Sequence, residues 1–208
     1  MSNERERETE TPAEKSLLKR LFFSGGIAEM KQSRQIAYIA VMTAFTVVAN
    51  MFFEFKLADV QFSLTIVVSA LSGILLGGAF GFVASFLGDL VGFLYNSGGY
   101  AYYPWIGLSM GLVALLAGVL VGGVRMPVRF GLQIKLAILS VVTFLLCTVA
   151  INTTAFWILY TKGVPYHTYL FTRLFVQGQI WNSLFNYGLL FVLVPVLGRV
   201  KPLKLNIR

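Results

Sequence analysis

The chain has 208 residues, of which 57% are hydrophobic and 12% charged, with a formal net charge of +8 at pH 7. Soluble domains carry about 25% charged residues and under about 50% apolar ones. A chain this small lacks the polar side chains to cover so much apolar surface, which excludes a soluble globular domain, a disordered chain and a disulfide-stapled secreted domain. Composition therefore predicts a polytopic membrane protein.

The first 34 residues differ from the rest of the chain. Residues 1–19 are rich in Glu, Arg, Lys, Ser and Thr and contain little that could be buried. We therefore expect residues 1–34 to form a polar, flexible tail that precedes the membrane-embedded part.

From Gln35 onward, long apolar runs alternate with short polar or glycine-rich stretches. A helix needs about 20 residues to cross the hydrocarbon of a bilayer. The runs are continuous rather than alternating at period two, which favours helices over a barrel. We therefore predict an all-α integral membrane protein with six transmembrane helices: Gln35–Phe52, Phe62–Leu76, Ala79–Tyr95, Trp105–Val121, Gln133–Tyr160 and Leu170–Leu197.

Basic residues are distributed unequally between the two sides of this bundle. One side has nine: Lys31, Arg34, Arg125, Arg129, Lys135, Arg199, Lys201, Lys204 and Arg208. The other side has three: Lys56, Lys162 and Arg173. The positive-inside rule then places both termini in the cytoplasm, with a six-helix membrane domain over 35–200 and a basic cytoplasmic tail over 201–208. Because these charges flank spans and form no stripe with interleaved aromatics, a nucleic-acid partner is not expected.

Asp89 is the acidic residue that lies clearly within a predicted span. Ionisable groups are costly inside a bilayer and mark functional sites by default. Two interpretations stay open, namely a contact to a ligand or partner and a structural hydrogen bond to a neighbouring helix.

The third loop, which follows the span of Asp89, is uncharged and unusually aromatic. It contains Asn96, Tyr100, Tyr102, Tyr103 and Trp105, with glycines at its start. An interfacial aromatic belt would explain one or two of these side chains. The density of aromatics beside flexible glycines favours a lid that closes over a ligand.

The last predicted helix carries polar residues in its outer half. Arg173, Gln177 and Trp181 are spaced i, i+4, i+8 and should share one face. An adjoining face would carry Gln179, Asn182, Ser183 and Asn186, and the preceding helix adds Asn152, Thr153 and Thr154. This collection predicts a polar cavity open to the exterior, rather than interhelical hydrogen bonds alone.

The sequence contains no pattern typical of catalysis or metal binding. It has no phosphate-binding GxxxxGK[ST] loop, no paired carboxylates and no Ser–His–Asp set, and its one histidine and one cysteine form no metal-ligand cluster. We expect a non-enzyme without a covalently bound cofactor or metal. Any active transport would need a partner or an ion gradient.

Several motifs resemble one family of membrane proteins over roughly residues 33–200. The first helix contains AVMTA, with Ala40 and Ala44 in an AxxxA pattern, and the last helix starts near an Arg and ends near Pro195. Between them, SALSGILLGGAFGFVASFLGDLVGFLY precedes a Gly/Tyr/Pro loop. Together with six helices and internal termini, these features resemble the S component, the substrate-binding membrane subunit, of an energy-coupling factor (ECF) vitamin transporter.

The resemblance implies a subunit of a bacterial plasma-membrane importer that binds a vitamin from the outside. It would associate with an ECF transmembrane scaffold subunit and two ATPase subunits, which would supply the energy. Ala40 and Ala44 would dock on the scaffold, because small side chains allow close approach of another helix. The substrate-binding candidates are Asp89, Asn96, Tyr100, Tyr102, Tyr103, Trp105, Asn152, Arg173, Gln177 and Trp181.

The vitamin is predicted from the chemistry of these candidates. Neutral amides, hydroxyls and aromatics suit cobalamin, whose rim of carboxamides both donates and accepts hydrogen bonds. Folate is the alternative, although folate-type relatives have an Arg where this chain has Asp59-Val60-Gln61-Phe62. Two other classes stay open, namely a stand-alone ion-coupled secondary transporter and a structural membrane protein without a ligand.

Overall fold

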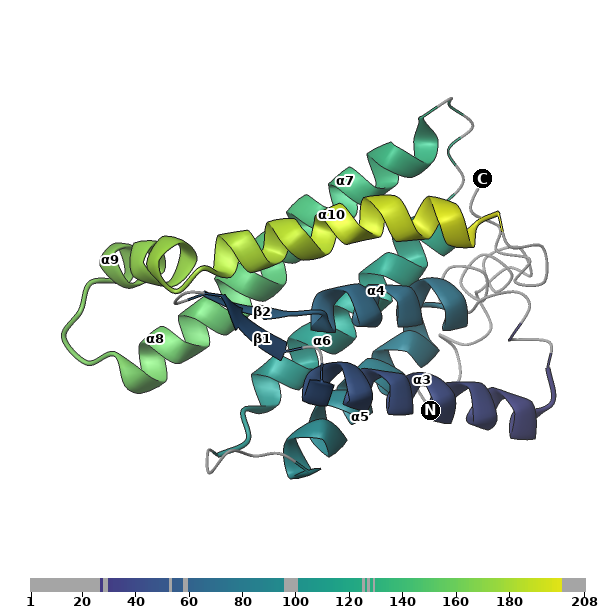
Figure 1. Ribbon diagram of the computed structural model, residues 1–208, viewed down its shortest axis with the longest axis horizontal. Coiled ribbons are helices and arrows are strands. Elements are labelled where there is room, and N and C mark those ends of the chain that lie inside the picture. The colour runs from purple at the N-terminus through teal and green to yellow at the C-terminus, as the bar shows by residue number, and fades with distance from the viewer. Residues whose placement is uncertain are drawn as a thin grey trace, which may run out of the picture.

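The computed structural model describes residues 27, 30–52, 54–57, 60–95, 101–124, 126, 128 and 130–199. Within these residues the protein is a helical bundle with one short β-hairpin (Figure 1). Five helical stretches are long and apolar enough to cross a membrane: Gln32–Phe52, Gly78–Tyr95, Pro104–Gly123, Gly131–Tyr160 and Gln179–Leu197. The prediction of a helical membrane protein is confirmed, whereas six full-length spans are not.

The second predicted span is shorter than expected because a β-hairpin takes up its start. Helix α3 (Gln32–Phe52) is followed by strands β1 (Glu54–Leu57) and β2 (Val60–Ser63), which pair antiparallel. Helix α4 (Thr65–Leu76) then has only 12 residues. At 1.5 Å per residue it is about 18 Å long, well short of a hydrocarbon core of about 30 Å.

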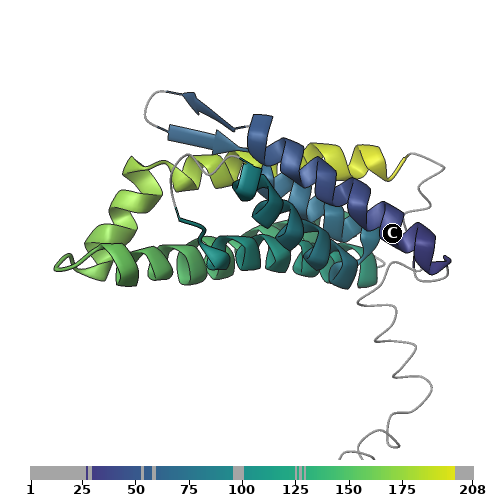
Figure 2. The same cartoon turned by 90° about the horizontal axis from the view of Figure 1, so that it is seen from below.

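The middle of the chain forms helix α5 (Gly78–Tyr95) and two composite helices. Helix α6 (Pro104–Ala117) continues into the π-helical segment η1 (Gly118–Gly123). The other composite is α7 (Gly131–Thr143), η2 (Phe144–Thr153) and α8 (Thr154–Tyr160). Figure 2 shows this second composite running along one side of the molecule, with the β-hairpin on the opposite side.

The sixth predicted helix is interrupted. Helix α9 (Tyr166–Phe171) and the π-helical segment η3 (Thr172–Val176) are separated from α10 (Gln179–Leu197) by Gly178, which has φ +75°. This left-handed conformation suits glycine and ends the helix. The prediction that Arg173, Gln177 and Trp181 share one helix face is therefore wrong, because the chain changes direction between them.

Glycines bring α4, α5 and the α6–η1 composite into backbone contact near the turn between α4 and α5. A Cβ atom on Gly73 would overlap the carbonyl oxygen of Ala114, and one on Gly118 would overlap the backbone of Gly78. Such close approach is how small residues hold membrane helices together by dispersion.

Helix α3 begins and α10 ends at the same end of the molecule (Figure 1). Lys31, Arg34 and Arg199 adjoin these two helix ends. Lys135 was expected between two spans, but it lies within α7 and is only 1% exposed. The predicted span Gln133–Tyr160 already included this position, so the error lay in counting Lys135 with the charges that flank the spans. Both predicted tails lie almost entirely outside the described residues.

Candidate functional site

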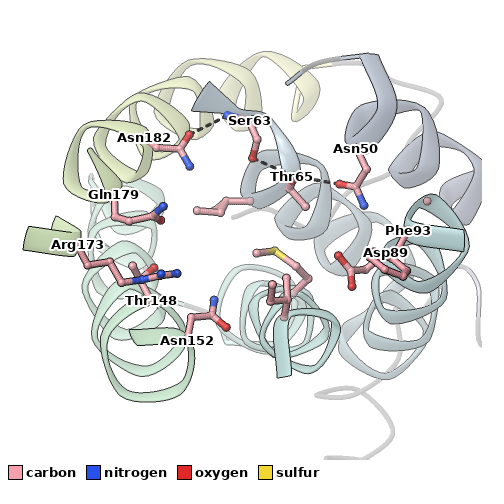
Figure 3. Close-up of a pocket in the computed structure, with 14 residues that line it drawn as sticks. Asn50, Ser63, Thr65, Asp89, Phe93, Thr148, Asn152, Arg173, Gln179 and Asn182 are labelled. Atoms are coloured by element: carbon pink, nitrogen blue, oxygen red, sulfur yellow. Dashed lines mark hydrogen bonds between the residues drawn. The ribbon is translucent and has the colours of Figure 1, made fainter. Parts of the chain in front are cut away.

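A cavity of about 340 Å³ opens at the end of the bundle where α3 ends and α10 begins (Figure 3). Its size is at the lower end of the range for small-molecule pockets. Polar and apolar side chains from α3, β2, α4, α5, α6, η2, η3 and α10 line it: Asn50, Ser63, Thr65, Ile66, Asp89, Gly92, Phe93, Ile106, Met110, Thr148, Asn152, Arg173, Gln179 and Asn182.

Asp89 lies on the α5 wall of the cavity. The Tyr102 hydroxyl donates a hydrogen bond to its Oδ2 over 3.2 Å, and the Tyr102 ring packs on Phe93 with centroids 5.1 Å apart. Burial raises the pKa of the Tyr102 phenol, and the Asp89 carboxylate raises it further. The phenol therefore stays protonated at physiological pH and remains the donor in this pair.

Arg173 lies on the opposite wall, on segment η3 (Figure 3). Its guanidinium carbon is 4.5 Å from the centroid of the Phe156 ring, and its Nη1 lies 3.5 Å from the Tyr169 hydroxyl. Its Nε is buried and has no hydrogen-bond partner among the described residues. The ring face and the tyrosine hold the guanidinium while leaving donors free for another acceptor.

Two asparagines of α10 fasten the hairpin and α4 to the cavity wall. Asn182 Oδ1 accepts from the Ser63 backbone N–H over 3.0 Å. Asn186 Oδ1 accepts from the Val67 N–H over 3.2 Å, and its Nδ2 donates to the Ser63 carbonyl over 2.7 Å. Asn186 is fully buried, and it satisfies the Val67 N–H in the first turn of α4, which the helix itself cannot, together with the last carbonyl of β2.

The same hydrogen-bonded chain continues to α3. The Thr65 hydroxyl donates to Asn50 Oδ1 over 3.0 Å, and the Ser63 and Thr65 hydroxyls lie 3.0 Å apart. On the far wall, Asn152 Nδ2 donates to the Ser109 hydroxyl over 3.0 Å. Such bonds replace water for polar groups inside a membrane bundle and fix the width of the cavity.

Some of the predicted site residues line the cavity and others do not. Asp89, Asn152 and Arg173 line one cavity, and Tyr102 contacts Asp89. Gln177 and Trp181 are exposed and do not line it, since the break at Gly178 turns them away. Asn96 and Tyr100 lie outside the described residues.

Tyr103 and Trp105 belong to an aromatic cluster beside the cavity rather than to its lining. Their rings stack with centroids 5.0 Å apart, and both pack edge-on against Phe156, at 5.2 and 5.6 Å. Because Phe156 also carries the Arg173 guanidinium, this cluster positions a cavity residue instead of forming the wall.

Several lining residues were not among the sequence candidates. Asn50, Ser63, Thr65 and Thr148 were missed, and Gln179 and Asn182 were noted only as an adjoining helix face. An amide at the end of an otherwise apolar helix, as at Asn50, was the available signal. Among the described residues, no group of three His, Cys, Asp or Glu side chains could hold a metal ion.

The docking candidates Ala40 and Ala44 lie on the outer face of α3. Both are exposed, as are their neighbours Val41 and Phe45, whereas the buried residues of α3 are Thr46 and Ala49. This face is apolar and carries small side chains, and no described element covers it.

A helical membrane bundle with a polar cavity at one end defines a membrane-embedded substrate-binding protein. The chain belongs to the family of the ECF-type riboflavin transporter S component, whose model matches residues 30–201. Proteins of this family are transport subunits and not enzymes, and they bind vitamins. The predicted resemblance is therefore confirmed.

A solved structure described as FolT bound with folic acid has a similar fold. The two chains share 19% sequence identity and a TM-score of 0.59, and the match covers 76% of this chain and 91% of the other. No protein with a curated function matched this sequence. The structural likeness, at this identity, shows the fold alone.

Proposed function

We propose that this chain is the vitamin-binding S component of an ECF importer in a bacterial plasma membrane, with both termini cytoplasmic. The observation that carries this proposal is the polar cavity at the end of the bundle opposite the start of α3 and the end of α10. With the predicted topology, that end faces the outside, where a vitamin would be captured. Partner ATPases would then drive its release inside.

The proposed cargo is a vitamin of the folate type. Cobalamin was the first expectation, but its corrin ring and nucleotide loop are far larger than the ligands that fit a cavity of about 340 Å³. The neighbour that binds folic acid and the pairing of a guanidinium with neutral amides in one cavity both favour folate. Arg173 takes over the anion-binding role that an Arg before the second helix would serve.

The test is a binding screen with the purified protein. Calorimetric titration against folate, cobalamin, riboflavin, pantothenate and thiamine should give tight binding of folate alone. Tight binding of cobalamin, with none of folate, would overturn the folate assignment. Binding of none, with intact protein, would favour a structural membrane protein.

The proposed partners are the ECF transmembrane scaffold subunit, which would dock on the exposed Ala40–Ala44 face, and two ATPase subunits. An Ala40→Trp substitution should abolish uptake and co-purification with the scaffold, because a bulky ring prevents close helix approach. Vitamin affinity should be unchanged, since Ala40 is far along α3 from Asn50 and the cavity.

Two measurements separate this docking proposal from its competitors. Tyr38→Trp changes an exposed residue on a different face of the same helix and is the matched control, which should leave uptake and co-purification unchanged. Loss of vitamin binding in Ala40→Trp with assembly intact would refute the docking site. Uptake in cells that lack the partner ATPases would instead support an ion-coupled transporter that acts alone.

A further inference from the structure

The cavity holds two opposite charges that do not neutralise one another. Asp89 on α5 and Arg173 on η3 point into it from opposite walls (Figure 3). Neither has an ion-pair partner among the described residues. Charged side chains within a membrane bundle normally pair with each other or face water, because an unpaired charge is costly there. Two separated charges that face one cavity therefore indicate that a ligand supplies the missing partner of each.

Asp89 can accept more hydrogen bonds than the protein supplies. Its Oδ2 accepts one from Tyr102, and the structure shows no other donor to the carboxylate within the described residues. A carboxylate offers about four lone-pair sites. Two adjacent N–H groups on one edge of a ligand, as in an aminopyrimidine ring, would match the two oxygens in parallel.

Arg173 complements Asp89, because its guanidinium has N–H donors that no described protein group accepts. One face of its guanidinium lies over Phe156, and Nη1 is directed to the Tyr169 hydroxyl. Its Nε has no partner in the part of the chain that the structure describes. A guanidinium presents five N–H donors in a planar fork that matches a carboxylate. An anionic group on the ligand would fit this edge.

The lining around these two charges is otherwise neutral. Amides come from Asn152, Gln179 and Asn182, and apolar contacts come from Ile66, Ile106 and Met110. Apolar side chains among single polar groups suit a flat, largely apolar central part with polar ends.

We infer that the cavity binds an elongated dipolar ligand in one orientation, with a paired N–H edge on Asp89 and an anionic group on Arg173. This inference rests on the proposed function and adds the direction in which the vitamin lies. Reversal would place the anion against the Asp89 carboxylate and leave the guanidinium facing N–H donors. Like charges and unmatched donors would then oppose binding.

A matrix of variants and ligands tests this orientation. The variants are Asp89→Asn and Arg173→Gln. The ligands are folate, folate dimethyl ester, which lacks the anionic carboxylates, and a 2-desamino analogue, which lacks the paired N–H edge. Each single change, in protein or ligand, should weaken binding about 10- to 100-fold, the value of a hydrogen bond to a charged group.

The diagnostic result is which changes fail to add. In the Arg173→Gln protein, esterification of folate should weaken binding little further. In the Asp89→Asn protein, removal of the 2-amino group should likewise weaken binding little further. Additive losses of affinity in both of these combinations would overturn the inference. Coupling between Asp89→Asn and the ester, or between Arg173→Gln and the 2-desamino analogue, would overturn it as well. Absence of folate binding to the unaltered protein would instead refute the folate assignment, so the two failures are distinguishable.

Controls separate these effects from unfolding. Arg173→Lys keeps the charge without the fork and should retain part of the coupling to the carboxylates. Lys162→Gln removes an exposed positive charge that does not line the cavity and should bind all three ligands unchanged. Thermal unfolding of each variant in detergent confirms that the compared proteins are folded.

Discussion

The same three helices behave differently at two levels of the bundle. Around Gly73 and Gly118, helices α4, α5 and α6 touch backbone to backbone. Toward the other end they line a cavity, whose wall is held by hydrogen bonds between Ser63, Asn182 and Asn186. Steric contact between backbones fixes the helices at one end of the bundle, and hydrogen bonds between polar side chains determine the shape of the cavity at the other.

The largest expected effect comes from breaking the backbone contact. Gly73→Ala places a Cβ on the Ala114 carbonyl oxygen, where no side chain can move aside. Overpacking of this kind costs about 1–3 kcal/mol or more. We expect a large fall in thermal unfolding temperature in detergent and a loss of folded yield.

Gly188→Ala is the matched control for that change. A Cβ at Gly188, which is also helical, would meet nothing within 4 Å. Alanine should leave stability unchanged or raise it by up to about 1 kcal/mol. Equal destabilisation by both substitutions would mean that the glycine contact does not set the packing.

The next largest effect is expected from the loss of hydrogen bonds at the cavity end of the bundle. Asn186→Leu leaves the Val67 N–H and the Ser63 carbonyl without their buried partner, at about 1–3 kcal/mol for each unsatisfied group. We expect both a lower unfolding temperature and at least about tenfold weaker vitamin binding, because the cavity wall loses its attachment. Differential scanning fluorimetry and calorimetric titration measure the two effects.

A neighbouring residue supplies the control. Tyr187→Phe removes the 2.9 Å hydrogen bond between Tyr187 and Thr143, which is buried but leaves the cavity wall intact. This variant should be less stable yet bind with unchanged affinity. A parallel loss of affinity in both variants would show that binding follows general stability and not the asparagine attachment.

A smaller effect is expected from the aromatic support of Arg173. Phe156→Leu removes the ring beneath the guanidinium, an interaction worth about 0.5–2 kcal/mol. Affinity for an anionic vitamin should fall about 2- to 30-fold. Phe156→Tyr keeps the ring and should bind nearly normally, and a loss in this variant equal to that in leucine would refute the positioning role.

The smallest effect is expected at Trp181. This side chain is 53% exposed and does not line the cavity. Trp181→Leu should therefore leave vitamin affinity within about twofold of the unaltered protein. A tenfold loss in the same titration would place Trp181 at the ligand and reinstate the helix face expected from its spacing.

Spans and charged site residues were predictable from the sequence for one physical reason. Lipid excludes polar groups, so long apolar runs mark helices, and rare ionisable residues such as Asp89 and Arg173 stand out. The hairpin was not predictable, because two strands of four residues carry almost no periodic signal beside a long apolar run.

Features that depend on tertiary geometry were also beyond the sequence. The break at Gly178 lies between Gln177 and Gln179 inside a predicted span, where a glycine is equally compatible with an unbroken helix. The burial of Lys135 and the hydrogen bond between Val67 on α4 and Asn186 on α10 depend on neighbouring elements rather than on local sequence. These contacts exist only because helices far apart in sequence meet in the bundle.

The short α4 has a consequence for the distance that a cargo must travel. A helix of 12 residues supplies only about 18 Å of a barrier that is about 30 Å thick. The cavity lies beside the start of α4, at Thr65 and Ile66, and the non-helical backbone of Ser63 is tolerated there because it lines a polar space. With the proposed topology, a vitamin bound in this cavity would lie below the outer surface of the membrane before the partner ATPases act.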